Sequence, residues 1–353
     1  MSATLQASAT IESPTAFPME PRGPLSERLM EILSAAPLDH PRLDLADIVG
    51  AALAAADVIA NDDDIQVSLF ILYGLHYGSF DAVSPEWEWH PSLIVARDLL
   101  ERAFEAQLRS TIDVPELPEP SVREVANALA ALTAVEGGPS LSRFVAKKAT
   151  AEQLGEFLVQ RSVYTLREAD PHSWAIPRLT GRSKAALVEI QSDEYGAGRP
   201  AQMHSAIFAT TMRAFGLDAT YGRYADDVPA ITFASLNVMS MFGLNRRLLG
   251  AIVGHLAAFE MTSSIPNGMY ANGFRRLGYG TDVTAYFDEH VAADAVHEQI
   301  AAHDLAGALA EDHPRLLGDI IFGAAACLAV DGWAGDHILQ AWTDGRSSLR
   351  QHG

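Results

Sequence analysis

Three potential metal ligands lie at helical spacing around residue 294. His290, Asp294 and His297 occupy positions i, i+4 and i+7, so they line one face of a helix with about 3.6 residues per turn. Only Val and Ala separate them, and two imidazoles with a carboxylate on such a small, apolar stretch suit metal ligation. The alternative is a solvated polar stripe that continues through Glu289 and Glu298.

A fourth candidate, Glu260, interrupts the apolar helix predicted over residues 245–263. Val253, Leu256 and Ala257 precede it on the same helical face. Because a buried carboxylate is costly without a partner, Glu260 would either shift its pKa or bind a cation. The alternative is that Glu260 simply ends the buried stripe near the C-terminus of its helix.

Glu194 and His204 are separated by a segment that breaks helices. On an unbroken helix their spacing of ten residues would leave them roughly 80° out of register. Gly196, Gly198 and Pro200 intervene, so one helix is predicted to end before them and the next to begin at the proline. A helix broken in this way can direct both side chains to one point.

Alternatives remain at this segment and at the last candidate. Glu189 and Asp193 are rival carboxylates to the one at position 194, and a charged helix end followed by a loop with an exposed histidine is a simpler interpretation. Glu168 lies near the end of the helix predicted over residues 150–169, with Tyr164 and Arg161 on its face. An ordinary helical ion pair between Glu168 and Arg161 is the alternative there.

Taken together, these candidates form a set with balanced charge. Four carboxylates and three neutral imidazoles would be neutralised by two divalent ions. A set of carboxylates and imidazoles without thiolates favours iron or manganese over structural zinc. Helical bundles build two-metal carboxylate sites from inward-facing residues. The predicted ligands are Glu168, Glu194, His204, Glu260, His290, Asp294 and His297.

The order and spacing of these residues resemble the haem-oxygenase-like diiron oxidases, often called iron-containing redox enzymes. The resemblance covers about residues 140–345, and it includes His290-x-x-x-Asp294-x-x-His297, the words Asp-Glu-Tyr-Gly around Glu194, and Glu260-Met-Thr-Ser-Ser. It implies an all-α, haem-oxygenase-like seven-helix bundle. It also implies two Fe ions (Fe2+/Fe3+), O2 as co-substrate, and the seven residues as metal ligands and catalytic groups.

Members of this family N-oxygenate amines and guanidines, cleave C–C bonds of amino or fatty acids oxidatively, or desaturate their substrates. His204 as a third histidine and the long N-terminal helical region resemble the N-oxygenating members most. For cleavage or desaturation of an acid, an Arg would bind the carboxylate, and Arg161 and Arg199 are the nearest candidates. A non-catalytic iron-binding protein of the same fold is the rival class, whereas a hydrolase with a cysteine nucleophile is disfavoured because Cys327 lies in an apolar helix.

Composition limits the partners. The formal net charge of -20 would repel nucleic-acid phosphates and anionic lipids, although solubility is an equally good explanation of it. We therefore expect a neutral, cationic or zwitterionic small-molecule substrate and an external electron donor, with no nucleic acid and no membrane as partner. The single cysteine, the lack of a signal-peptide pattern and the lack of an apolar run of membrane-spanning length favour the cytoplasm.

Three segments are predicted along the chain: a flexible leader over residues 1–24, an N-terminal helical region over 25–120, and the diiron domain over 121–353. Three prolines in residues 113–120 mark the linker. Aromatic residues of the N-terminal region favour core packing or a homodimer contact over substrate binding. The helices expected are 48–60, 65–76, 92–110, 121–135, 141–147, 150–169, 182–195, 201–215, 229–242, 245–263, 281–304, 313–330 and 332–344.

Overall fold

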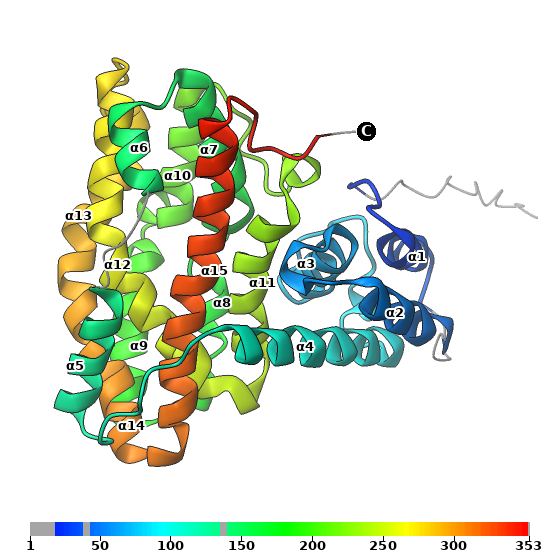
Figure 1. Ribbon diagram of the computed structural model, residues 1–353, viewed down its shortest axis with the longest axis horizontal. Helices are drawn as coiled ribbons and strands as arrows, with labels where there is room; N and C mark the ends of the chain where they lie inside the picture. The colour runs from blue at the N-terminus through cyan, green and yellow to red at the C-terminus, as the bar shows by residue number, and fades with distance from the viewer. Residues whose placement is uncertain (1–17, 38–42, 135–139, 352–353) are drawn as a thin grey trace, which may run out of the picture.

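The computed structural model describes residues 18–37, 43–134 and 140–351, without the side chains of residues 43 and 292–295 (Figure 1). Helices joined by loops and short turns make up these ranges, and no strand occurs in them. The prediction of an all-α fold is therefore confirmed.

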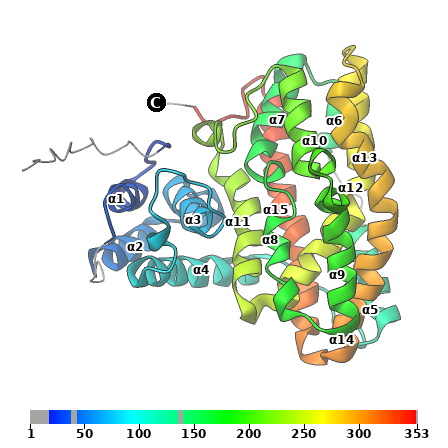
Figure 2. The same cartoon turned by 180° about the vertical axis from the view of Figure 1, so that it is seen from behind.

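The N-terminal region forms a separate group of helices on one side of a larger bundle (Figures 1 and 2). Its helix α3 (Asp63–His76) packs against α11 (Ala230–Leu244) of the bundle, where the ring centroids of Phe70 and Phe233 lie 4.7 Å apart. One hydrophobic core runs through both groups. The four helices are α1 (Pro24–Leu33), α2 (Leu43–Ala55), α3 (Asp63–His76) and α4 (Pro91–Thr111).

The bundle follows after an irregular stretch that contains the three prolines. Ser121 caps α5 by accepting a hydrogen bond from the Glu124 amide, and Thr150 and Gln153 form a capping box at the start of α7. Besides α11, the bundle contains α5 (Val122–Thr133), α6 (Leu141–Lys147), α7 (Ala151–Thr165), α8 (Asp170–Ser173), α9 (Gly181–Glu194), α10 (His204–Phe215), α12 (Leu249–Arg276), α13 (Thr281–Gln299), α14 (Ala308–Asp312) and α15 (Leu317–Thr343).

The two longest helices, α12 and α15, pack at very close range. A Cβ atom on Gly254 would meet the Ile320 carbonyl oxygen at 1.8 Å, and one on Gly323 would meet the Ala251 carbonyl oxygen at 2.0 Å. Only glycine permits this approach of two backbones.

Both long helices also correct an expectation about apolar length. Arg246–Arg276 and Pro314–Thr343 are each long and apolar enough to cross a membrane by length and composition, contrary to the sequence-based expectation. Their most apolar windows are 61% and 56% buried inside the protein, as befits helices of the bundle core.

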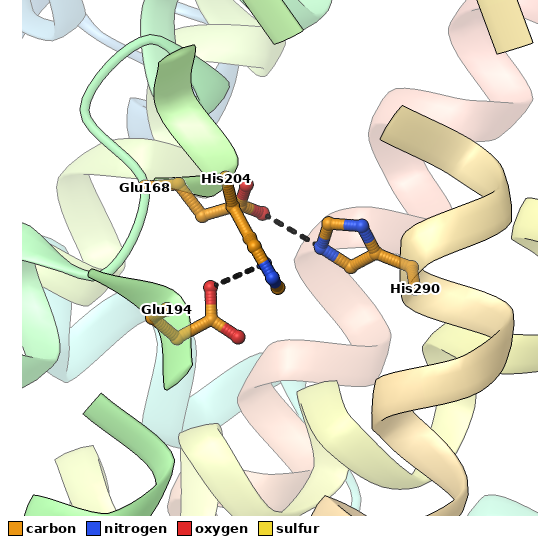
Figure 3. Close-up of side chains that lie close together, drawn as sticks. All are labelled: Glu168, Glu194, His204 and His290. Atoms are coloured by element: carbon orange, nitrogen blue, oxygen red, sulfur yellow. Dashed lines mark ion pairs between the residues drawn. The ribbon is translucent and has the colours of Figure 1, made fainter. Parts of the chain in front are cut away.

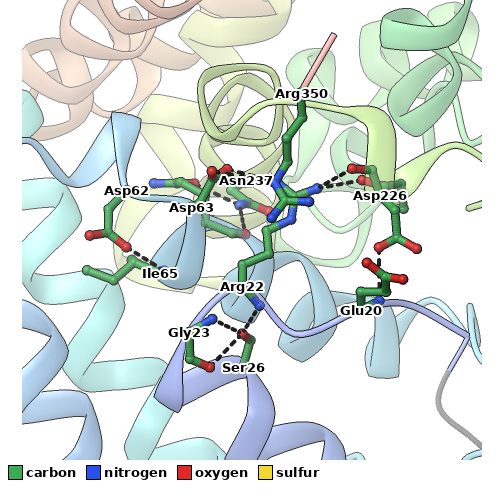
Figure 4. Close-up of polar contacts among 12 residues, drawn as sticks. Glu20, Arg22, Gly23, Ser26, Asp62, Asp63, Ile65, Asp226, Asn237 and Arg350 are labelled. Atoms are coloured by element: carbon green, nitrogen blue, oxygen red, sulfur yellow. Dashed lines mark hydrogen bonds and ion pairs between the residues drawn. The ribbon is translucent and has the colours of Figure 1, made fainter. Parts of the chain in front are cut away.

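The segment before α1 is attached to the bundle, which differs from the flexible leader predicted over residues 1–24. Met19 is buried, and Arg22 donates hydrogen bonds to Asp63, at 2.9 Å, and to the Ala225 carbonyl oxygen, at 2.6 Å (Figure 4). Arg350, near the other end of the chain, also approaches Asp63, at 3.6 Å. Residues 1–17 of the predicted leader lie outside the described part of the chain, and the domain boundaries remain predictions.

Several predicted helix boundaries are wrong, and the helix expected over residues 48–60 is α2, which spans Leu43–Ala55. Helix α7 ends at Thr165, so Glu168 lies in the turn that follows it. Helix α12 continues through Pro266 to Arg276, because its neighbours α6, α13 and α15 hold it on several sides. Helix α15 is continuous where a break was expected near residue 331.

Candidate metal centre

Six of the seven predicted ligands converge in the middle of the bundle. They come from the turn after α7, the last residue of α9, the first residue of α10, and the interiors of α12 and α13. Each is at most 7% exposed, so these side chains lie inside the protein. The seventh, Asp294, has its backbone in α13, but its side chain lies outside the described residues.

The first cluster combines two carboxylates and two imidazoles (Figure 3). Glu168, Glu194, His204 and His290 each offer one ligand atom, and these atoms all lie within 4.8 Å of one another. His204 Nδ1 is 2.8 Å from a Glu194 oxygen, and His290 Nε2 is 3.5 Å from a Glu168 oxygen. Four donors facing one small volume can enclose a single ion.

A second cluster lies beside the first and shares one residue with it. Glu194, Glu260 and His297 also bring ligand atoms within 4.8 Å of one another. His297 Nδ1 is 3.4 Å from Glu260 Oε2 and 3.8 Å from Glu194 Oε1. Glu194 thus faces the first cluster with Oε2 and the second with Oε1, as a carboxylate between two cations would.

The backbone is unusual on both sides of this centre. Ala169, directly after Glu168, has φ 75°, and Ala197, between Glu194 and His204, has φ 49°. They are the non-glycine residues with positive φ in the described ranges, and such conformations cost energy that the surrounding structure must offset. Gln191 holds the first turn by donating to the Ala169 carbonyl oxygen at 2.8 Å.

The second turn also depends on a glycine. Gly196 has φ 68°, and a Cβ there would meet the Gln202 carbonyl carbon at 2.6 Å. This tight reversal joins the end of α9 to the start of α10. It confirms that the chain breaks where Gly196, Gly198 and Pro200 predicted, and it turns Glu194 and His204 toward each other.

Tyr286 holds two of the candidate ligands in place, and the sequence analysis missed it. Its hydroxyl donates to Glu168 Oε1 at 2.7 Å, and its carbonyl oxygen accepts a hydrogen bond from His290 Nδ1 at 2.8 Å. Since Nδ1 of His290 carries the proton, the lone pair of the neutral ring lies on Nε2, on the side of Glu168. Tyr286 precedes His290 by one helical turn, and that spacing was a visible signal.

Asp193 has the same relation to His297. His297 Nε2 donates to Asp193 Oδ2 at 3.2 Å, which leaves Nδ1 toward Glu260 and Glu194. A carboxylate on the far nitrogen of a histidine is the usual support of a metal ligand. Asp193, a rival ligand in the sequence analysis, therefore orients a candidate ligand, whereas Glu189 is exposed on α9.

Carboxylates dominate the proton affinities of these histidines. Burial acts to lower the pKa of His297, but Glu260, Asp193 and Glu194 outweigh it and raise the pKa to about 9. Burial likewise opposes protonation of His204, and Glu194 nevertheless raises the pKa of this imidazole. Burial raises the pKa of Glu168, yet His290 and His204 bring it below its ordinary value. Without metal, protons on the imidazoles compensate the carboxylates.

The donor atoms fit a pair of iron ions. Glu168 Oε2, His204 Nδ1 and His297 Nδ1 are buried and make no hydrogen bond of good geometry in the described structure. Buried polar atoms in proteins are usually hydrogen-bonded, so three unsatisfied ligand atoms that face a common space suggest a cation site. Oxygen and imidazole donors without a thiolate suit iron.

The simpler sequence interpretations do not hold for two of the candidates. His204 is 2% exposed instead of lying on a surface loop. No ion pair joins Arg161 to Glu168 in the described part of the chain; the Arg161 guanidinium instead lies 5.5 Å and 5.9 Å from the ring centroids of Phe157 and Tyr270. Tyr286 lies between the two groups, because it donates to Glu168 and shares a hydrogen bond with Arg161.

A bundle of helices around two carboxylate–imidazole clusters defines the class of this protein. A sequence model of the iron-containing redox enzymes matches residues 155–332, just over half of the chain. The chain belongs to this family and has its haem-oxygenase-like, all-helical fold.

One relative has a more specific name. Over 158 residues the chain is 28% identical to a nitrosourea synthase of Streptomyces achromogenes subsp. streptozoticus. The match covers 44% of this chain and 33% of that protein, so the chain corresponds to about a third of the relative's length.

Proposed function

We propose that the protein binds two iron ions and uses them to reduce dioxygen for the N-oxygenation of an amine, amino acid or guanidine. The observation that carries the diiron part is the pair of donor clusters joined by Glu194. Ferrous iron at these positions would supply electrons to dioxygen. Glu168, His204 and His290 would hold one ion, and Glu260 and His297 the other, with Asp294 as a further predicted ligand.

The other residues of the site orient these ligands and exclude water. Tyr286 fixes both Glu168 and His290, and Asp193 fixes the proton-bearing nitrogen of His297. The rings of Tyr164 and Phe259, with centroids 5.6 Å apart, lie over the site and line its small pocket. Apolar walls of this kind keep bulk water from the reacting atoms.

Nitrogen is the atom that we propose to be oxidised. The relative's name, nitrosourea synthase, denotes a product with a nitroso nitrogen, and His204 provides the third histidine typical of N-oxygenating members. In hydroxylation of an amine, one oxygen atom enters an N–H bond and the other leaves as water. That balance requires two electrons and two protons, and the predicted external donor supplies the electrons.

The experiment is an anaerobic titration of the full chain with ferrous iron, followed by exposure to dioxygen. We expect saturation near two equivalents per chain and consumption of dioxygen, with products of candidate amines and acids identified by mass. Lack of iron binding would refute the diiron proposal. If the protein turns over only carboxylic acids that lack nitrogen, C–C cleavage or desaturation replaces N-oxygenation in the proposal. The diiron part then stays intact.

A further inference from the structure

A second cavity lies next to the metal centre. It has a volume of about 340 Å³, is partly open to solvent, and is lined by parts of α6, α7, α11, α12 and α15. This volume is in the range of sites for small organic ligands. Tyr164 and Phe259 line both this cavity and the small pocket at Glu168, Glu194 and His290, so the two spaces meet at this pair of rings.

Arg161 places a positive charge in the wall of the cavity. Burial alone would lower the pKa of its guanidinium, but Tyr286, Tyr270 and Glu168 together raise it, so the group stays charged. Its Nε atom is buried and makes no hydrogen bond in the described structure. The guanidinium also shares a hydrogen bond with the Tyr286 side chain, and the planar fork of such a group suits a carboxylate.

Asp331 places a negative charge in the same wall. It accepts a hydrogen bond from Ser235, and the residue is exposed, although desolvation in the cavity wall raises the pKa of its carboxyl group. Both statements hold for a group that faces a cavity within the protein. No ion pair joins Asp331 to Arg161 among the described residues, although the guanidinium is close enough to oppose the rise in the pKa of Asp331, and both side chains line the cavity.

The cavity therefore offers one cation and one carboxylate between apolar surfaces such as Phe157 and Met239. We propose that this cavity binds the substrate as an amino acid, with its carboxylate on Arg161 and a cationic nitrogen on Asp331. This inference rests on the proposed function for its redox role, but it makes a separate claim about binding. It also joins the two sequence-based expectations, a nitrogen substrate and a carboxylate on Arg161.

Two further observations favour this cavity. Asp336 also lines it, so its described charged side chains are one positive and two negative, which favours a ligand with an additional cation. Arg199, the other arginine considered from the sequence, is exposed and lines a different hollow, which includes His204. An amino acid with a basic side chain, such as L-lysine, is accordingly the first probe.

The test measures binding of three probes to the full chain by calorimetry, with and without ferrous iron, under anaerobic conditions. L-Lysine carries a carboxylate and cations, cadaverine lacks the carboxylate, and hexanoate lacks the nitrogens. We expect L-lysine to bind about tenfold or more tightly than either of the others, as the loss of one charged hydrogen-bonding partner implies.

The variants separate the two contacts. Arg161→Gln should weaken L-lysine binding about tenfold and leave cadaverine unchanged, whereas Asp331→Asn should weaken L-lysine and leave hexanoate unchanged. Arg161→Lys keeps the charge without the planar fork, so its affinity should lie between wild type and Arg161→Gln. The exposed controls Arg213→Gln and Asp312→Asn should bind all three probes as wild type does.

The inference is overturned if wild type binds the three probes equally or not at all, or if Arg161→Gln weakens cadaverine as much as L-lysine. Should Arg161→Gln not fold, Arg161→Lys and Asp331→Asn decide the outcome by the same ratios. Iron titration of wild type is independent of these ratios. Binding of two equivalents of iron without selectivity among the probes would refute substrate binding in this cavity and leave the diiron proposal standing. Selectivity among the probes without iron binding would refute the diiron proposal and leave the cavity proposal standing.

Discussion

Two groups of buried histidines lie close together in this bundle, and their pKa values are shifted in opposite directions. His172 and His255 contact each other, with Nε2 and Nδ1 3.2 Å apart, and burial lowers the pKa of His172 to about 3 and that of His255 also well below its ordinary value. His204 and His297 are buried to the same degree, yet carboxylates raise the pKa of both.

The difference shows that burial alone does not make a histidine a metal ligand. His172 and His255 are neutral, contact each other through one pair of ring nitrogens, and pack on the apolar ring of Phe259. The second group faces Glu168, Glu194 and Glu260, whose charges require either protons or metal ions. We therefore expect substitutions in the two groups to have opposite consequences for stability and for iron.

The largest effect is expected from Glu194→Ala. Because Glu194 belongs to both clusters, its loss should reduce iron affinity about 100-fold or more and remove both equivalents. Anaerobic ferrous titration with metal analysis measures this. Glu189→Ala, on the exposed side of the same helix, is the control and should retain two equivalents. Two equivalents in Glu194→Ala would disprove the shared-ligand arrangement.

A second pair of variants tests the contrast between the groups directly. His255→Ala should destabilise the protein by about 2–4 kcal/mol, since it opens a cavity and removes the partner of His172, while iron binding persists. His297→Ala should instead abolish iron binding at its cluster and leave a folded helical protein. Denaturant unfolding in the presence of chelator, together with iron titration, checks both. Loss of iron in His255→Ala at unchanged stability would reverse our assignment of the two groups.

Tyr286→Phe tests the support of the first cluster. The variant keeps the ring contacts but loses the hydroxyl that donates to Glu168, so iron affinity should fall about 10- to 100-fold. Competition with a chelator of known affinity gives the value. Tyr279→Phe, whose ring packs on Phe215 and Phe274, should bind iron as wild type does. Equal affinities in the two variants would leave Tyr286 with a packing role only.

The smallest effect concerns pH. The pKa of His297 is raised to about 9, above the ordinary 6.5, so its protonated form stabilises the metal-free fold fully below pH 6.5. That contribution is lost as pH rises through 9. Iron must displace the same proton, so iron affinity should rise across this window with release of protons, measurable by calorimetry in buffers of different ionisation enthalpy.

Asp193→Asn sharpens the pH prediction. It removes one of the carboxylates that raise the pKa of His297, so the window of proton release should move to lower pH. The Asp193 side chain is 58% exposed, and a partly exposed ion pair of about 0.2–1 kcal/mol changes affinity only a few-fold. A window that does not move would exclude Asp193 as the group that orients His297.

The sequence predicted the composition of the candidate site better than its construction. Spacing on one helix face anticipated that His290 and His297 would face inward, and helix breakers anticipated the turn between Glu194 and His204. Glu168 was expected on a helix but lies in a turn where Ala169 adopts φ 75°, a conformation that only tertiary contacts such as Gln191 impose. No local sequence pattern predicts this turn.

The long helices show a similar limit. The helix predicted over residues 245–263 continues through Pro266 to Arg276, because packing against several helices outweighs one missing hydrogen bond. Residues 19–24 were predicted to belong to a flexible leader because no local pattern shows their contacts. Arg22 contacts Asp63 and Ala225, which lie far away in the sequence. The periodicity of apolar residues predicts which face of a helix is buried, but it does not predict which other elements that face contacts.

The position of Glu194 has a consequence for the order of events during loading. Glu194 directs one carboxylate oxygen toward each cluster, so fixing its side chain for one ion also fixes it for the other. The first ion would immobilise the side chain, and the second would then find half of its environment already arranged, at the cost of repulsion from its neighbour. Iron uptake by this bundle should therefore be cooperative or anticooperative according to which of these opposing contributions is larger, and the shape of the titration curve reports their difference.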